Sequence, residues 1–246
     1  MTTDHNTESP DTDREILRDR LLDAALTHVP FDGWTAAALN AAGRDIGVAH
    51  AVALNAFPGG PAEMIEFWNR RSDQRMLAAL EARDLSTMRF RDRVALAVRL
   101  RLEAAGIREA VRRGLSFLSL PQNAALGARC LYRTVDAIWH GLGDRSTDFS
   151  FYTKRGLLAA VYGATVLYWL DDRSEGSANT WTFLDRRIGD VMKITEVRQG
   201  LEKGLERLTE RLPDPLGILR GGKLGAGKAR RRRPGRPPRR GAASTS

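Results

Sequence analysis

Apolar residues recur along most of this chain at three- and four-residue intervals, the spacing of helices that bury one face. Thr12 and Glu15 have the spacing of a capping box that begins a helix. The stripe behind them consists of Ile16, Leu17, Leu21, Leu22, Ala25 and Leu26. Ala, Leu and Arg are frequent, and proline is rare between residues 31 and 212, which favours an all-α fold. Further helices are predicted over 35–42, 49–56, 61–85, 90–105, 107–118, 122–139, 148–171, 179–193 and 195–212.

The segment from Gly156 to Leu170 is the most apolar of these, with fifteen residues and no charge. It is shorter than the ~18 residues that a membrane-spanning helix needs. Ser146, Thr147 and Asp148 lie at the start of the helix predicted over 148–171, which contains this segment, and each can cap its first turn. The pattern predicts a surface patch next to a buried apolar chamber.

The last predicted helix has a narrow apolar stripe, Val197, Leu201, Leu205 and Leu208, on an otherwise charged surface. Two interior glycines, Gly200 and Gly204, weaken it by about 1 kcal/mol each. We interpret residues 194–212 as a marginal amphipathic helix that becomes ordered on binding, with packing on the body of the protein as the alternative.

Charge is concentrated at the C-terminus. Residues 213–246 hold ten basic residues and one acid, while the other 212 residues hold 29 of each sign. A Gly-, Pro- and Arg-rich segment cannot form a core, so we expect a disordered basic tail, and residues 1–11 are expected to be disordered too. Such a tail binds polyanions or anionic membranes, or simply keeps the protein in solution.

Motifs for chemistry are missing. None of the four histidines follows a Glu at the Glu-x-x-His spacing of di-iron sites, and the single cysteine, Cys130, excludes an internal disulfide. Residues 222–229 approach a phosphate-binding loop but lack its final Ser or Thr. We predict no metal, no cofactor and no enzymatic activity.

Residues 12–58 place a long helix, a short helix, a glycine turn and a second short helix in succession. That order resembles the DNA-binding end of TetR-type regulators. The second short helix, around His50–Ala56, holds no Arg or Lys with which to contact bases or phosphates. We interpret it as a degenerate helix-turn-helix that packs and binds no specific nucleic acid sequence. The alternative is a TetR-type DNA-binding transcriptional regulator.

Four motifs carry a closer resemblance: residues 33–36 (Gly-Trp-Thr-Ala), 120–123 (Leu-Pro-Gln-Asn), 139–155 and 179–187. They resemble the ninth coenzyme Q (ubiquinone) biosynthesis protein family in order and without large gaps, from Ile16 to Arg211. The run Gly143-Asp144-x-Ser146-Thr147-Asp148-Phe149 is specific to that family.

The resemblance implies a homodimeric, TetR-like, lipid-binding accessory protein, here a bacterial, cytoplasmic member that lies peripherally on the inner membrane. Such a protein presents a polyprenyl-quinone intermediate to a hydroxylase of the ubiquinone pathway, such as the di-iron demethoxyubiquinone hydroxylase. Its partner-binding residues map to Asp148, Phe151 and Tyr152. Its amphipathic membrane helix maps to residues 194–212, with the membrane-binding stripe Val197, Leu201, Leu205 and Leu208. Its lipid-binding chamber lies in residues 59–193, and we expect the isoprenoid lipid to contact Trp139, Leu157, Leu158, Val161, Tyr162 and Val166. Alternatively, these same residues fill the core and the dimer contact.

Overall fold

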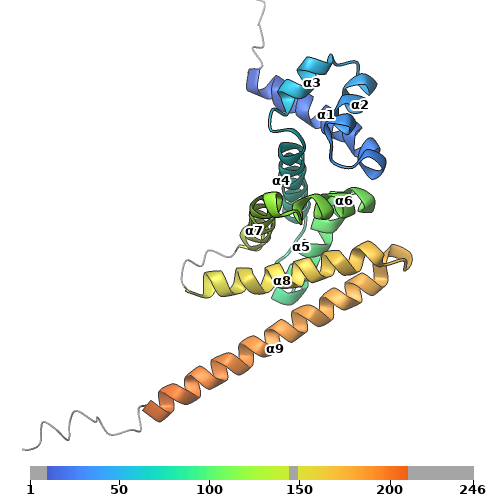
Figure 1. The fold of residues 1–246 in the computed structure, drawn as a ribbon. Coiled ribbons are helices and arrows are strands. Elements are labelled where there is room, and N and C mark those ends of the chain that lie inside the picture. The colour runs from blue at the N-terminus through green and yellow to red at the C-terminus, as the bar shows by residue number, and fades with distance from the viewer. Residues whose placement is uncertain (1–9, 144–148, 210–246) are drawn as a thin grey trace, which may run out of the picture. The chain divides into compact units, whose positions relative to one another are not determined.

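The computed structural model describes residues 10–143 and 149–209, and the side chains of residues 12–143 and 153–193. Every regular element in this part of the chain is a helix, which confirms the predicted all-α fold (Figure 1). The longer helices are α1 (Pro10–Asp32), α2 (Ala36–Asp45), α3 (His50–Ala56), α4 (Gly60–Glu81), α5 (Phe90–Ala105), α6 (Arg108–Leu118), α7 (Ala124–Gly141), α8 (Phe149–Asp171) and α9 (Ala178–Thr209). Two single turns of 3₁₀ helix, Pro121–Asn123 and Glu175–Ser177, precede α7 and α9.

Two expectations about helix ends were wrong. Helix α1 begins at Pro10, so Thr12 lies inside the first turn and does not cap it. Proline suits a first helical position because its missing N–H would have no partner there. The two helices expected over 179–193 and 195–212 are one helix, α9, since no Gly or Pro interrupts the chain between them. The chain divides into two compact units at Thr195, so α9 contributes residues to both.

Helices α1 to α3 form the helix-turn-helix-like part. The Thr35 hydroxyl caps α2 by accepting a hydrogen bond from the Ala38 N–H at 3.2 Å. A side chain added at Gly43 would place its Cβ 3.2 Å from the Cβ of Ala53, so the glycine lets α2 and α3 approach closely. Ala53 and Ala56 are buried, but Val52 is 45% exposed and Leu54 is also exposed. The expectation that α3 packs is thus confirmed for Ala53 and Ala56 only.

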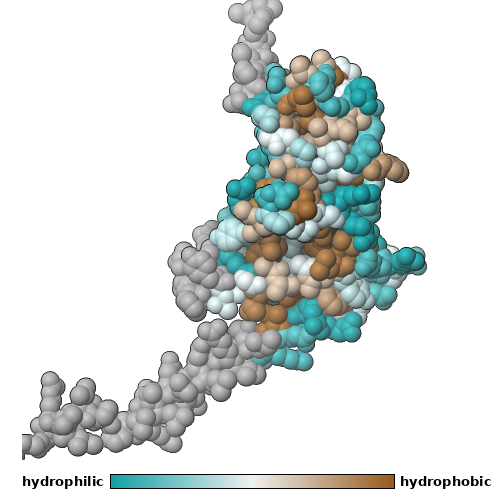
Figure 2. Space-filling view, viewed as in Figure 1, coloured by the Kyte–Doolittle hydropathy of each residue, from teal (hydrophilic) through white to brown (hydrophobic). Residues whose placement is uncertain are grey.

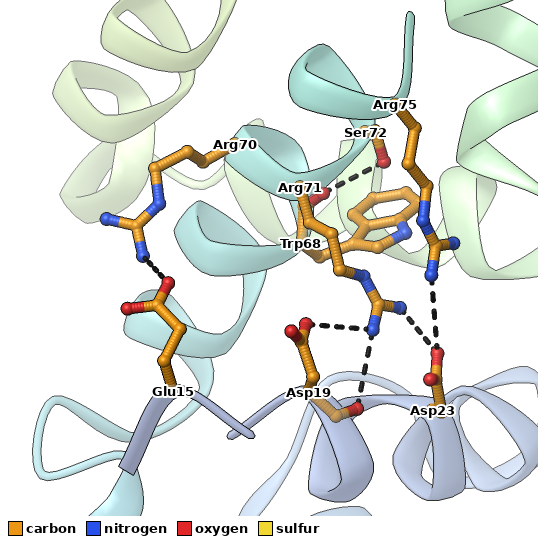
Figure 3. Close-up of polar contacts among 8 residues, drawn as sticks. All are labelled: Glu15, Asp19, Asp23, Trp68, Arg70, Arg71, Ser72 and Arg75. Carbon is orange, nitrogen blue, oxygen red and sulfur yellow. Dashed lines mark hydrogen bonds and ion pairs between the residues drawn. The ribbon is translucent and has the colours of Figure 1, made fainter. Parts of the chain in front are cut away.

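Helix α4 joins this part to the rest of the first unit (Figure 3). On one face Arg71, a buried residue, donates from Nη1 to the carboxylate and the carbonyl of Asp19 at 3.3 Å, and its Nη2 lies 2.7 Å from Asp23. Arg70 Nη2 lies 3.4 Å from Oε1 of Glu15 in α1. Trp68, three residues before Arg71 and on the same side of α4, packs against Trp34, with ring centroids 5.0 Å apart. A shift of α1 would therefore disturb the ion pairs that Arg70 and Arg71 make with it.

The corner between α8 and α9 is fixed by Asp172. Its carboxylate accepts four hydrogen bonds, from the N–H and hydroxyl groups of Ser174 at 2.8 and 2.6 Å and of Thr180 at 2.9 and 2.6 Å. The Ser174 and Thr180 hydrogen bonds hold the pKa of Asp172 well below its usual range. Arg108 of α6 adds a 2.6 Å hydrogen bond to the Ser177 hydroxyl and another to the Asp172 carbonyl. These contacts set where α9 starts against the body.

Candidate ligand cavity

A cavity of about 380 Å³ lies within the first unit, between α4, α5, α6, α7 and α8. Most of its wall is apolar, including Ile65, Leu102, Val111, Leu115, Leu118, Leu131 and Val166. Its volume lies at the lower end of the roughly 300–1,000 Å³ typical of small-molecule pockets. The cavity is lined by residues from five helices, so it is created by the way these helices pack and not by any one of them.

A buried polar cluster meets this apolar wall. Arg101 of α5 donates from Nε to Asp73 of α4 at 2.5 Å and from Nη2 to the Asn69 side-chain oxygen at 2.8 Å. The Thr134 hydroxyl of α7 donates to Asp73 at 2.9 Å. The Asn69 amide nitrogen also lies 3.3 Å from Asp73 and from Thr134. Three of these residues, Arg101, Asn69 and Thr134, line the cavity, so it has a defined polar region.

Burial and neighbouring charged groups both shift the pKa values in and beside this cluster. Burial raises the pKa of Asp73, against the opposing effect of Arg101. Burial acts to lower the pKa of Arg101, but the neighbouring Tyr162 and Asp73 outweigh it and raise that pKa. Burial also raises the pKa of Tyr162, so its phenol stays protonated at neutral pH and remains a hydrogen-bond donor.

The opening of the cavity is marked by the lining residues that are exposed. Leu167 of α8 lines the cavity and is 62% exposed, and the exposed Ser119 follows α6. Arg101 and Leu102 are almost fully buried and mark the inner end. Figure 2 shows apolar residues gathered over α6, α7 and α8 on the side of the molecule in view. An apolar chain leaving the cavity beside Leu167 would meet further apolar surface.

The predicted lipid-binding residues divide into two groups. Tyr162 and Val166 line the cavity. Trp139, Leu158 and Val161 lie in the hydrophobic core, Leu157 is half-buried, and none of these four is among the residues lining the cavity. Trp139 stacks on Phe90 of α5 with ring centroids 5.6 Å apart.

The sequence prediction missed the polar residues of the cavity, although a signal was present. Arg101 follows Val94, Ala97 and Val98 at helical spacing, so a charged residue interrupts an otherwise apolar stripe of α5. Asp73 interrupts the buried stripe of α4 in the same way. A charge on a buried stripe requires a partner, which points to a pair in the interior.

The other predicted site residues lie outside the described side chains. Phe151 and Tyr152 belong to the first turn of α8, and Val197, Leu201, Leu205 and Leu208 belong to α9. Asp148 and the tail 213–246 lie outside the described residues altogether. In the described part of the chain, no cluster of His, Cys, Asp and Glu is arranged to hold a metal ion. No helix there is long and apolar enough to cross a membrane.

The COQ9 family model matches residues 124–195, from the start of α7 into α9. Two curated relatives, "Ubiquinone biosynthesis protein COQ9, mitochondrial" of Rattus norvegicus and of Homo sapiens, are each 34% identical over 207 residues, or 80% of this chain. The chain belongs to the COQ9 family. It spans 66% and 64% of the length of these two relatives. A COQ9 relative from Dictyostelium discoideum is 29% identical over 76% of the chain.

A solved structure, a TetR transcriptional regulator from Nitrosomonas europaea, has a TM-score of 0.59 with this COQ9 family member and 21% sequence identity. The match covers 71% of this chain and 97% of the regulator. This confirms the TetR-like helical fold expected from the order of the N-terminal helices.

Proposed function

We propose that this protein is a non-enzymatic accessory protein of ubiquinone biosynthesis, which binds a polyprenyl-quinone intermediate and presents it to a hydroxylase of that pathway. The observation that carries the proposal is the mostly apolar cavity between α4 and α8, found in a member of a family whose relatives are named ubiquinone biosynthesis proteins. Burial of an isoprenoid tail in such a cavity contributes about 25 cal/mol per Å² of apolar surface.

Gly163 offers a direct test of lipid binding. It lines the cavity, and a Cβ added there meets no atom within 4 Å, so a larger side chain at this position grows into empty space. Gly163→Leu should therefore exclude the lipid without a clash, and replacing a mid-helix glycine should stabilise α8 by up to about 1 kcal/mol. Gly156→Leu is the matched control, because Gly156 is on the same helix, is equally free of neighbours and is not among the lining residues.

The measurement is mass spectrometry of the organic extract of each purified protein. We expect an isoprenoid quinone with the unmodified protein and with Gly156→Leu, and its loss with Gly163→Leu. Retention of the lipid by Gly163→Leu would place it outside this cavity. An unmodified protein without any isoprenoid would contradict the proposed function itself.

The hydroxylase is proposed to bind around Asp148, Phe151 and Tyr152, at the start of α8. Tyr152→Lys should abolish co-purification of the hydroxylase and leave the far-UV circular dichroism of the helices unchanged. Tyr132→Lys, a change at an exposed tyrosine of α7, is the control. If the complex survives Tyr152→Lys, the partner-binding residues lie elsewhere.

Membrane binding is proposed for the stripe Val197, Leu201, Leu205 and Leu208 of α9. Leu201→Glu together with Leu205→Glu should reduce flotation with phospholipid vesicles, and Gln199→Glu, which adds charge off the stripe, should not. Equal flotation of both variants would remove the support for a membrane helix.

The proposed homodimer is supported by exposed apolar side chains on α8 and α9, among them Tyr168 and Met192.

The alternative, a DNA-binding TetR-type regulator, receives less support from α3. Its exposed side chains include Val52, Leu54 and Asn55, and none of its residues is Lys or Arg. Specific retardation of a promoter fragment by a protein lacking residues 213–246 would favour the regulator.

A further inference from the structure

We propose that Arg101 and Tyr162 make the inner end of the cavity selective for a neutral head group with an oxygen acceptor, such as the carbonyl of a quinone ring, over acids and phosphates. The inference rests on the proposed function, because it assigns the head group of a lipid that the cavity binds. It concerns a different part of the cavity from the apolar wall that would hold the tail.

Two donors at this end have no acceptor among the described residues. The hydrogen bonds of Arg101 to Asp73 and Asn69 use Nε and Nη2, and they leave Nη1 available. The Tyr162 hydroxyl makes no hydrogen bond within the described part of the chain. Since both residues line the cavity, a ligand oxygen that enters it can accept hydrogen bonds from both donors in place of water.

The charges of Arg101 and Asp73 determine which kind of head group the inner end of the cavity favours. Arg101 is the one charged residue among those that line the cavity in the described part of the chain, and its charge is already balanced by Asp73 at 2.5 Å. An anionic head group would bring an unbalanced negative charge next to Asp73 in a buried site, which is costly. A neutral carbonyl or ether oxygen accepts from the same donors without adding charge.

The position of the pair also sets the orientation of the ligand. Arg101 is almost fully buried at the inner end, whereas Leu167 is exposed at the opening. A head group held by Arg101 and Tyr162 therefore lies inside with its isoprenoid tail directed outward. About 380 Å³ suits a ring and the first part of a tail, so a long polyprenyl chain would continue past Leu167.

The test uses the delipidated full-length protein and three probes with the same two-isoprene tail. These are a benzoquinone carrying the tail, a hydrocarbon of the tail without oxygen, and the tail as its diphosphate. Quinone binding is followed by quenching of tryptophan fluorescence, since Trp68 lines the cavity, and the other two probes by displacement of the quinone. We expect the quinone to bind most tightly and the diphosphate to bind at least about tenfold more weakly, because its charge would be buried beside Asp73 without a counter-charge.

Tyr162→Phe removes one hydroxyl that holds no described residue, so the fold should be retained. It should weaken quinone binding by roughly two- to tenfold, the value of one hydrogen bond, and leave hydrocarbon binding unchanged. Tyr168→Phe is the matched control on the same helix, at a residue that stacks on Phe183 and is not among the lining residues. The double variant Asp73→Leu with Arg101→Met removes the arginine donors and keeps the interior neutral, and should weaken quinone binding by at least about tenfold.

The outcomes separate this inference from the proposed function. If the hydrocarbon and the quinone bind the unmodified protein equally, or Tyr162→Phe leaves quinone affinity unchanged, the head-group assignment is overturned and lipid binding stands. Diphosphate binding as tight as quinone binding would also overturn it. If neither the quinone nor the hydrocarbon binds, both the inference and the lipid-binding function are wrong.

Discussion

Removing one partner from the pair of Asp73 and Arg101 should destabilise this protein far more than removing one partner from an exposed pair. Asp73→Asn removes the negative charge and leaves the guanidinium buried without its counter-charge. The two side chains are 9% and 4% exposed, so solvent screens the loss very little. Breaking a buried pair of this kind costs about 3–5 kcal/mol. Because asparagine can still accept a hydrogen bond from Arg101, we expect a loss near 3 kcal/mol.

Urea unfolding followed by circular dichroism measures this difference, with thermal unfolding as a second measurement. For a protein of this size, 3 kcal/mol corresponds to a fall in Tm of roughly 6–12 °C. The control is Glu103→Gln, which breaks the pair of Arg99 and Glu103 on the same helix at 2.8 Å. Those side chains are 49% and 48% exposed, so this change should cost no more than about 0.5 kcal/mol.

Asp73 and Arg101 should also behave as a unit when both are replaced. Asp73→Leu combined with Arg101→Met leaves no buried charge, and should be more stable than either single variant. If Asp73→Asn costs no more than Glu103→Gln, or if the double variant is as unstable as the sum of the single ones, the buried pair does not act as argued.

Two further predictions concern the helix ends. The pKa of Asp172 is lowered in the folded protein, so its contribution to stability is complete above the ordinary value of 3.8 and is lost as the pH falls below it. Asp172→Ala should therefore be less stable than the unmodified protein at neutral pH, with a difference that shrinks in acid, and a difference that stays constant with pH would contradict this. Thr35→Ala removes the cap of α2 and should lower the free energy of unfolding, measured in urea, by about 1 kcal/mol. Thr27→Ala, whose exposed hydroxyl donates to a carbonyl within α1, should lower it by less, and equal losses for the two variants would contradict a specific contribution of the cap.

The sequence by itself determined the helical architecture of this protein. The period of the apolar residues predicted nearly every helix, and α5 matches the expected range 90–105, because amphipathic spacing is a local property that survives packing. The arrangement resembling TetR proteins also followed from local signals, the short helices and the glycine turn. The helix ends were less well predicted: α1 begins at Pro10, and the expected break before Thr195 is absent. The position of a helix end depends on the interactions of a few residues, each of which contributes only a small free energy.

Only the tertiary structure decided where the cavity lies. The sequence pattern of an apolar helix is the same whether its side chains fill a core or line a cavity. The prediction therefore grouped the core residues Trp139, Leu158 and Val161 with Tyr162 and Val166, the two that line the cavity. The polar cluster joins Asn69, Asp73, Arg101 and Thr134 from three helices, up to 65 positions apart in the chain. Such a cluster forms because buried charges must find partners in space, and the partners are fixed by how helices pack and not by their order in the chain.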